Sequence, residues 1–208
     1  MTHKQTWWDK EIKEQFNEFK SWVGPTTAET KVWARKYILN QDYKSIVDIG
    51  CGMCDEYHAY HKEKPGIWWV GVDSSEFLSS RVGAGIVVNE EGHNTKFKDS
   101  EFDVAYSRHV LEHQKNYKPI LTEMIRIGSK EVIHIFFIAP RDKEIINYNS
   151  DNNLYHNTYD RNEIEQFLKE HPKVGGWYWK KIGATEEALI IATKNRYKED
   201  WYNKSEIE

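Results

Sequence analysis

A short apolar run that breaks into two closely spaced glycines constrains this chain more than any other feature. Residues Ser45 to Asp55 read SIVDIGCGMCD, and Gly50 and Gly52 follow the last apolar residues of the run. Glycine adopts backbone angles that are closed to other residues and leaves room for a ligand beside the main chain. A helix that begins near Cys54 would aim its free N–H groups at such a ligand. The pattern is typical of a buried parallel strand leading into a nucleotide-cofactor turn, although a turn without a ligand has the same sequence.

The size and charge of the chain narrow its class. Its 208 residues fit one domain, since a single hydrophobic core suits chains of up to roughly 250 residues. The net charge is −4 and the 29 Lys and Arg residues are spread along the chain, which makes a small molecule a better partner than nucleic acid. No apolar stretch approaches the roughly 18 residues of a membrane span, and we see no secretory signal. We therefore expect no membrane contact and a cytoplasmic location.

The two cysteines of the chain, Cys51 and Cys54, form a C-x-x-C pattern. Such a pair can be a redox couple or half of a zinc site. A zinc site would need a second ligand pair at similar spacing, and the sequence offers none. We interpret both cysteines as small residues of the glycine-rich turn and predict no metal.

Apolar runs alternate with helical patterns through most of the chain, as in β-α-β units. The runs are nearly continuous, which indicates a mostly parallel sheet covered by helices on both faces. The expected strands are Ile46–Ile49, Ile67–Val72, Ala84–Val88, Phe102–Tyr106 and Val132–Ile138. The expected helices are Trp7–Val23, Thr26–Leu39, Asp55–Lys64, Ser75–Arg81, Tyr117–Ile127 and Asp160–Glu170. These elements predict an α/β fold.

The C-terminal third changes character. Two β-rich runs, Trp177–Lys181 and Ala188–Thr193, flank a hairpin-like connection at residues 183–186. We therefore expect the last strand to enter the sheet antiparallel to its neighbours. The domain boundaries that follow are an N-terminal helical extension at 1–25, the α/β domain at 26–194 and a charged tail at 195–208. We expect the extension to pack on the sheet, with a lid or a dimer contact as alternatives.

An acidic residue stands where a cofactor ribose would need one. The second expected strand ends in Gly71-Val-Asp73, about 20 residues after the glycines. A carboxylate at the end of the neighbouring strand can accept hydrogen bonds from both ribose hydroxyls. Capping of the following helix is the alternative role, and Ser74 could serve there instead. With the glycines in place, we favour ribose binding by Asp73.

A third motif separates the cofactor classes. Residues 96–113 read KFKDSEFDVAYSRHVLEH, a turn, a strand and a polar cluster at the end of that strand. Together, IVDIGCGMCDE, GVDSS and KDSEFDVAYSRHVLEH resemble the cofactor motifs of class I S-adenosylmethionine-dependent methyltransferases, in particular a small-molecule subgroup. The three matches keep the family's order and spacing, and the resemblance covers roughly residues 26–194.

The resemblance implies a Rossmann-like, seven-stranded sheet whose final strand is antiparallel, and S-adenosyl-L-methionine as the cofactor. It places Asp48, Gly50, Cys51 and Gly52 along the methionine part and Asp73 at the ribose. Ser74 and Ser75 would flank the adenosine, and Ser107, Arg108 and His109 would close over the methionine end.

Two positions depart from the family pattern. Cys54 replaces the usual third glycine, which would change how closely the helix packs on the strand. Many members also place an acidic residue before the fourth strand to bind the adenine amino group. This chain has Glu91-Gly-His-Asn94 there, so His93 or Asn94 would have to substitute.

His113 is the candidate catalytic residue. A histidine can act as a general base near neutral pH, and an acidic neighbour such as Glu112 can orient it. The alternative is that the pair begins the next helix and packs the cofactor loop. His134 falls inside a strand and is interpreted as a core residue.

The segment from Ala139 to Tyr159 is the candidate acceptor site. A connection this long is unusual in a compact domain unless it is functional, and it leaves the sheet at the edge where ligands of α/β folds bind. Its candidate acceptor-binding residues are Arg141, Tyr148, Tyr155 and His156. An ordinary surface loop is the alternative.

The sequence thus predicts a methyltransferase that transfers a methyl group from S-adenosylmethionine to an O, N or C atom of a small molecule. One alternative is an RNA or protein methyltransferase of the same fold. Another is an NAD(P)-dependent oxidoreductase, which would use the same glycines and Asp73, and a third is a non-catalytic binding module. The acceptor and the oligomeric state are not encoded in any motif we recognise.

Overall fold

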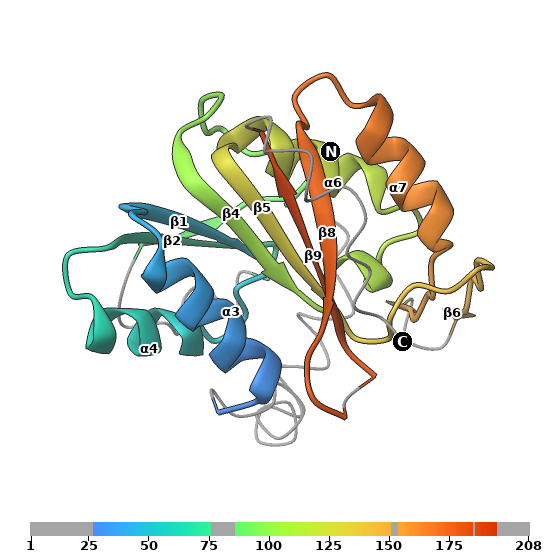
Figure 1. The fold of residues 1–208 in the computed structure, drawn as a ribbon, viewed down its shortest axis with the longest axis horizontal. Coiled ribbons are helices and arrows are strands. Elements are labelled where there is room, and N and C mark those ends of the chain that lie inside the picture. The colour runs from blue at the N-terminus through green and yellow to red at the C-terminus, as the bar shows by residue number, and fades with distance from the viewer. Residues whose placement is uncertain (1–26, 76–85, 151–153, 185, 195–208) are drawn as a thin grey trace.

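The structure is a computed structural model that describes residues 27–75, 86–150, 154–184 and 186–194. Its centre is a seven-stranded sheet with the order β3-β2-β1-β4-β5-β9-β8 (Figure 1). The strands are β1 (Ser45–Ile49), β2 (Trp68–Asp73), β3 (Ile86–Asn89), β4 (Phe102–Arg108), β5 (Gly128–Phe136), β8 (Gly176–Lys181) and β9 (Ala188–Thr193). The predicted helix Trp7–Val23, residues 76–81 of the predicted helix Ser75–Arg81 and the C-terminal tail lie outside the described residues.

The sheet is parallel except where β9 enters it. Strand β1 pairs in parallel with both β2 and β4, β2 with β3, and β4 with β5. Strand β9 runs antiparallel to both of its neighbours, β5 and β8. The predicted α/β class with an antiparallel last strand is therefore confirmed. Because the chain leaves β1 toward β2 and β3 and then returns to β4 on the other side, the switch point of the sheet lies between β1 and β4.

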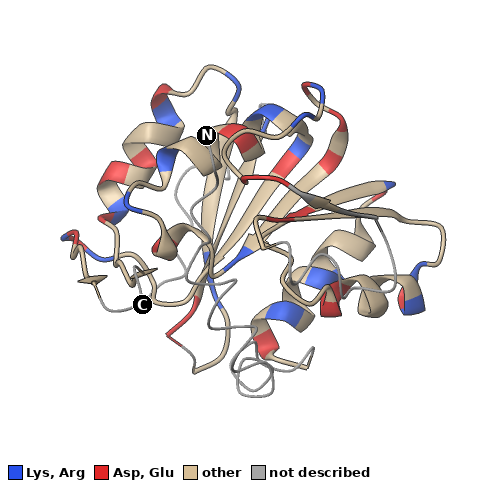
Figure 2. Cartoon of the chain, turned by 180° about the vertical axis from the view of Figure 1, so that it is seen from behind, with Lys and Arg blue, Asp and Glu red and all other residues tan. Residues whose placement is uncertain are grey.

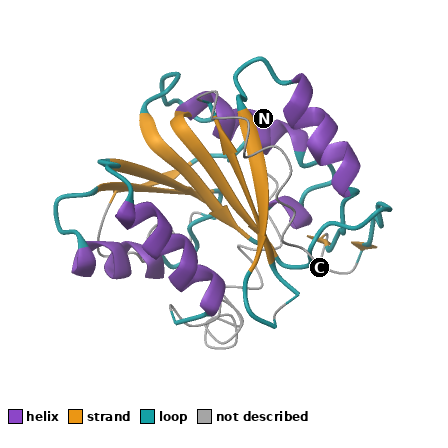
Figure 3. Cartoon of the chain, in the orientation of Figure 1, coloured by secondary structure: helices purple, strands orange, loops and turns teal. Residues whose placement is uncertain are grey.

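Helices cover both faces of the sheet (Figure 3). Neighbouring residues along a strand point to opposite faces, so Ile46 and Val47 of β1 belong to two separate cores. Helices α3 (Glu29–Asn40) and α4 (Asp55–Glu63) pack on the Ile46 face, and α6 (Lys118–Ile127) and α7 (Arg161–Glu170) pack on the Val47 face. Burial on both sides explains why the strands are apolar without alternation.

Strand β5 differs from its predicted span of Val132–Ile138. It begins at Gly128, directly after α6, and ends at Phe136. Its first residues, Ser129 to Glu131, are polar, so a search for apolar runs misses them although their main chain is in the sheet. Phe137 leaves the sheet because its N–H donates to the carboxylate of Glu112.

The segment after β5 contains more regular structure than a loop. Strands β6 (Tyr148–Asn149) and β7 (Leu154–Tyr155) form a small antiparallel sheet of their own. The rings of Tyr148 and Tyr155 lie opposite each other, with their centroids 4.7 Å apart. Strands β6 and β7 have two residues each, so they are too short to give an alternating pattern in the sequence.

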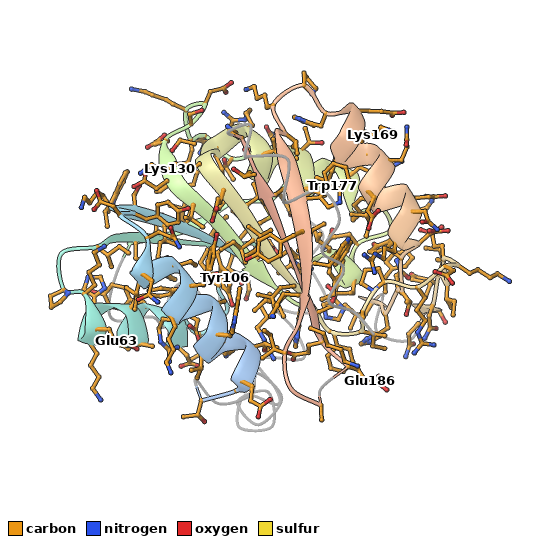
Figure 4. The ribbon with its side chains drawn as sticks, viewed as in Figure 1. Glu63, Tyr106, Lys130, Lys169, Trp177 and Glu186 are labelled. Carbon is orange, nitrogen blue, oxygen red and sulfur yellow. The ribbon has the colours of Figure 1, made fainter. Side chains whose placement is uncertain are left out.

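Charged residues of both signs are interspersed along the described helices and strand ends (Figure 2). In Figure 4, Lys130 marks the end of the sheet where β5 begins, and Glu186 marks the opposite end, where the parallel strands finish. The candidate site lies at this second end. No helix in the described ranges has the length and apolarity needed to cross a bilayer.

Candidate functional site

A cavity of about 550 Å³ opens where β1 and β4 diverge at their carboxyl ends. This volume is within the range of pockets that hold cofactor-sized molecules. Ten of the predicted site residues line it: Asp48, Gly50, Cys51, Gly52, Asp73, Ser74, Arg108, His109, His113 and His156. Seven others do not: Ser75, His93, Asn94, Ser107, Arg141, Tyr148 and Tyr155.

The turn after β1 requires glycine. Gly50 and Gly52 have φ angles of +73° and +53°, in the left-handed region that other residues avoid. A Cβ atom on Gly50 would lie 2.3 Å from Cγ2 of Val110, whereas one on Gly52 would meet nothing within 4 Å. The N–H of Gly50 donates to the carbonyl of Val72 over 2.7 Å, which ties the turn to the end of β2.

Asp73 links this turn to the next strand. Its Oδ2 accepts a hydrogen bond from the Gly52 N–H over 2.9 Å, and its Oδ1 accepts one from the Ser75 N–H over 2.8 Å. A carboxylate has about four lone-pair sites in all, which is why one such group can accept several hydrogen bonds. Ser74 lines the cavity beside it, while Ser75 is fully buried.

Cys54 occupies the position of the family's third glycine and takes a glycine-like conformation. Its φ is +56°, in the left-handed region, immediately before α4. Its N–H donates to the carbonyl of Cys51 over 2.9 Å, which closes a tight turn. The replacement of glycine therefore preserves the backbone path. The two thiols are free, with the sulfur atoms 3.4 Å apart, and the contact with Cys54 together with burial raises the pKa of Cys51.

A carboxylate from the β8–β9 hairpin fixes the end of β4. Glu187 Oε1 lies 2.6 Å from Nη2 of Arg108 and 2.9 Å from Nε2 of His109. Its Oε2 accepts a hydrogen bond from the hydroxyl of Thr30 on α3. Burial favours the neutral acid, but His109, Thr30 and Arg108 outweigh it and lower the pKa of Glu187 to about 2. The charged form of Glu187 thus joins α3, β4 and the hairpin at the rim of the cavity.

Ser107 faces away from the cavity. Its hydroxyl lies 2.6 Å from Nδ1 of the buried His134, whose Nε2 lies 3.4 Å from Oε2 of Glu112. His134 is therefore a core residue, as its position in a strand predicted. Tyr106 and Arg108, on either side of Ser107, line the cavity instead.

The polar residues of the cavity that the sequence did not reveal as site residues include Lys31, Glu56 and Glu90. Lys31 of α3 lies 3.8 Å from Glu56 of α4, and both line the cavity beside Asp48. Burial, reinforced by Glu56, raises the pKa of Asp48 well above its usual range. The available signal was a pair of cations, Lys31 and Arg35, one turn apart in an otherwise buried helix face.

The adenine end of the predicted site shifts by a few residues. His93 and Asn94 are exposed and lie outside the cavity, whereas Glu90, Glu91 and Gly92 line it. Oε1 of Glu90 also forms an ion pair with Nζ of Lys96 over 3.1 Å. Acidic residues therefore do follow β3 at the cavity, and they lie slightly before His93 and Asn94 in the chain.

His113 lies on the other side of the cavity. Its Nδ1 is 2.7 Å from the carbonyl oxygen of Tyr155. A carbonyl only accepts, so Nδ1 carries the proton and Nε2 is the acceptor nitrogen of the neutral ring. Burial lowers the pKa of His113, which favours this neutral form. Tyr155 thus contributes its main chain, while Arg141 and Tyr148 are exposed.

In the described ranges, no three His, Cys, Asp or Glu side chains come together in an arrangement that could hold a metal ion. Residues 47–136, which include β1 to β5 and most of the cavity wall, match the family model described as a methyltransferase domain. Residues 47–136 carry the domain of a class I S-adenosylmethionine-dependent methyltransferase. The recognition made from the three motifs is confirmed, and S-adenosyl-L-methionine is the cofactor of such a domain. The match favours this methyltransferase over the dinucleotide-dependent oxidoreductase that the glycines and Asp73 alone left open.

Solved structures share the fold of this methyltransferase at low sequence identity. A Burkholderia thailandensis 1,6-didemethyltoxoflavin-N1-methyltransferase, with its substrate and S-adenosylhomocysteine bound, has a TM-score of 0.66 and 14% identity over 89% of this chain and 86% of that one. The plantazolicin methyltransferase BpumL has a TM-score of 0.64 and 16% identity over 92% and 94%. A methyltransferase from Methanosarcina mazei has a TM-score of 0.56 and 16% identity over 76% and 96%. No curated protein sequence matches the chain.

Proposed function

We propose that this methyltransferase transfers a methyl group from S-adenosylmethionine to an oxygen, nitrogen or carbon atom of a small molecule. The observation that carries the proposal is that the glycine turn, Asp73 and His113 all line one cavity. A donor on one side and an acceptor on the other would therefore share one space. Holding them aligned can supply several kcal/mol of the barrier.

The residues of the cavity suit this cofactor. The left-handed turn at Gly50 and Gly52 leaves the main chain bare, as a close-lying methionine group requires. Asp73 would hold the ribose hydroxyls, and Ser74 would lie beside the adenosine. When bound, the cofactor supplies an electrophilic methyl group, whose carbon–sulfur bond breaks with the electron pair remaining on sulfur as the acceptor's electron pair forms the new bond.

His113 would act as the general base of the reaction. The Tyr155 carbonyl fixes the proton on Nδ1, which makes Nε2 the basic nitrogen of the neutral ring. A neutral imidazole in this tautomer can take the proton from an acceptor O–H or N–H. Acceptors that are already nucleophilic would not need it.

Two observations favour a small acceptor over RNA or protein. The charges of the chain sum to −4, and the described Lys and Arg residues are interspersed with Asp and Glu along the ribbon (Figure 2), a pattern that does not favour a phosphate backbone as partner. The related folds named above include enzymes solved with small molecules or natural-product analogues in place.

We also propose a cytoplasmic location, because both thiols are free and a reducing compartment keeps them so.

Calorimetry tests the cofactor half of this proposal. We expect S-adenosylhomocysteine to bind the full chain with 1:1 stoichiometry and NAD to show no binding under the same conditions. Absence of S-adenosylhomocysteine binding to folded protein would overturn the proposal. Incubation of metabolite, nucleotide, sugar and peptide pools with methyl-labelled cofactor would then identify the acceptor, and label confined to RNA or protein would contradict its small-molecule half.

A further inference from the structure

The cavity has two chemically different halves. Charged side chains gather on the side of α3, α4 and the ends of β1 to β3, where Lys31, Asp48, Glu56 and Asp73 line the wall together with the Glu90–Glu91 pair. The other side is built after β4, after β5 and around β7. Its lining is mainly rings and apolar groups, and Arg108 at the boundary is paired with Glu187.

Two ring pairs border this second half. The rings of His109 and Phe137 meet edge to face, with centroids 5.2 Å apart and planes at 76°. The rings of His113 and His156 do the same at 5.1 Å and 87°. Edge-to-face contacts of this kind are the arrangement that aromatic groups favour, and a planar ligand can add to them.

Phe137 is unusually exposed for a large apolar side chain at a cavity. It retains 54% of its accessible surface, although its ring contacts His109. Apolar area left open beside a cavity is commonly covered by a ligand. A ring or other apolar surface of the acceptor would gain free energy by covering Phe137.

Hydrogen bonds from distant segments hold the ring-lined half in place. Phe137 donates its main-chain N–H to the carboxylate of Glu112, and the Asn157 N–H donates to the main-chain carbonyl of Glu112 over 3.0 Å. His113 is held by the Tyr155 carbonyl. Glu112 is itself buried beside His134, so one buried residue positions the chain on both sides of the rings. Preorganised walls reduce the entropy cost of binding a flat ligand.

The histidines of this half favour an uncharged acceptor. Burial lowers the pKa of both His109 and His113, so both imidazoles are neutral near pH 7. Apart from Arg108, which is paired with Glu187 at the boundary, the charged side chains of the cavity lie on the opposite side, where the cofactor would sit. A charged acceptor would have to enter the ring-lined half without a counter-ion from either imidazole.

We propose that the ring-lined half, formed by His109, His113, Phe137, Leu154 and His156, binds an aromatic or heteroaromatic acceptor. The ring of the acceptor packs against Phe137, and its O–H or N–H points at Nε2 of His113, which takes the proton and passes it to water. The inference rests on the function proposed above, because it assigns the acceptor side of the same cavity.

The test uses 2-naphthol and decahydro-2-naphthol, which share a skeleton and a hydroxyl but differ in aromaticity. Binding is measured by calorimetry on the full chain saturated with S-adenosylhomocysteine. We expect 2-naphthol to bind at least about tenfold more tightly. Equal affinities, or no binding of 2-naphthol at millimolar concentration, would overturn the inference. Failure of S-adenosylhomocysteine to bind would instead overturn the proposed function.

Variants locate the subsite. Phe137→Leu should lower the affinity for 2-naphthol about fivefold or more, and leave that for S-adenosylhomocysteine within twofold. Trp68→Leu is the matched control, because Trp68 is also exposed but lies at the start of β2, away from the strand ends that form the cavity. It should change neither affinity. A Phe137→Leu protein that binds 2-naphthol as tightly as the wild type would remove Phe137 from the subsite.

Discussion

The main-chain N–H of Gly52 donates a hydrogen bond to Oδ2 of Asp73 over 2.9 Å. The glycine turn after β1 and the carboxylate at the end of β2 are therefore one unit, although 21 residues separate them in the chain. A change at either residue should alter the shape of the cavity wall at the other. This unit is where the cofactor half of the site can be tested most directly.

Replacement of Asp73 should weaken cofactor binding. Asp73→Ala removes the proposed ribose acceptor and leaves the Gly52 N–H without its partner. Loss of hydrogen bonds to a charged group costs about 2 kcal/mol or more, so we expect S-adenosylhomocysteine affinity to fall at least about 30-fold. Asp42→Ala is the control, since Asp42 is exposed and lies before β1. An Asp73→Ala affinity within twofold of wild type would contradict the ribose assignment.

The two glycines of the turn should differ in their tolerance of alanine. Gly50→Ala adds a clash with Val110 to the cost of a positive φ, so we expect the free energy of unfolding to fall by about 2–4 kcal/mol. Gly52→Ala carries only the backbone cost, about 1 kcal/mol. Urea denaturation measures both. In the Val110→Ala background, Gly50→Ala should lower the free energy of unfolding by less than it does in the wild type. An equal loss in both backgrounds would show that the clash is not the cause.

Glu187 should make stability depend on acid pH. Its folded-state pKa of about 2 is below its ordinary value of 4.5, so its stabilisation is fully present above about pH 4.5 and is lost as pH falls toward 2. Glu187→Gln should lower the free energy of unfolding at pH 7 by about 2 kcal/mol and flatten this acid limb. Glu186→Gln, one residue away and exposed, is the control. Identical pH profiles for wild type and Glu187→Gln would refute the network at the end of β4.

His113 should govern the pH dependence of turnover once an acceptor is known. Because burial lowers its pKa, the basic form is already present at pH 7, and kcat should be flat above about pH 6.5 and fall at lower pH. His113→Gln should lower kcat by roughly 10²–10⁴ and abolish this limb, with S-adenosylhomocysteine affinity unchanged. An unchanged kcat would assign His113 to packing alone.

The cofactor half of the site was predictable because its residues follow strand ends. A strand that runs into glycines, and an acid at the end of the next strand, must meet at one edge of a parallel sheet. The orientation of Ser107 was also predictable in principle. Side chains alternate along a strand, so Tyr106 and Arg108 share one face and Ser107 takes the other. The family motif predicts that Ser107 contacts the cofactor, whereas the alternation along β4 predicts that Ser107 faces away from the cavity.

The ring-lined half of the cavity was less predictable because it depends on contacts between distant segments. Phe137 has no motif, and its position follows from a hydrogen bond to Glu112, 25 residues earlier. Lys31 and Glu56 meet only because α3 packs beside α4. Tyr155 acts through its carbonyl, which any residue could supply. The sequence pointed to the loop that brings His156 to the cavity, but could not separate this residue from the exposed Arg141 and Tyr148.

The position of β9 has a consequence for how this protein is made. It is the last strand of the described residues, yet it lies inside the sheet, between β5 and β8. During synthesis, one edge of β5 should therefore stay unpaired until residues 188–193 have left the ribosome. We expect nascent chains that stop before residue 188 to be prone to aggregation, and the C-terminal hairpin to complete folding in a single late step.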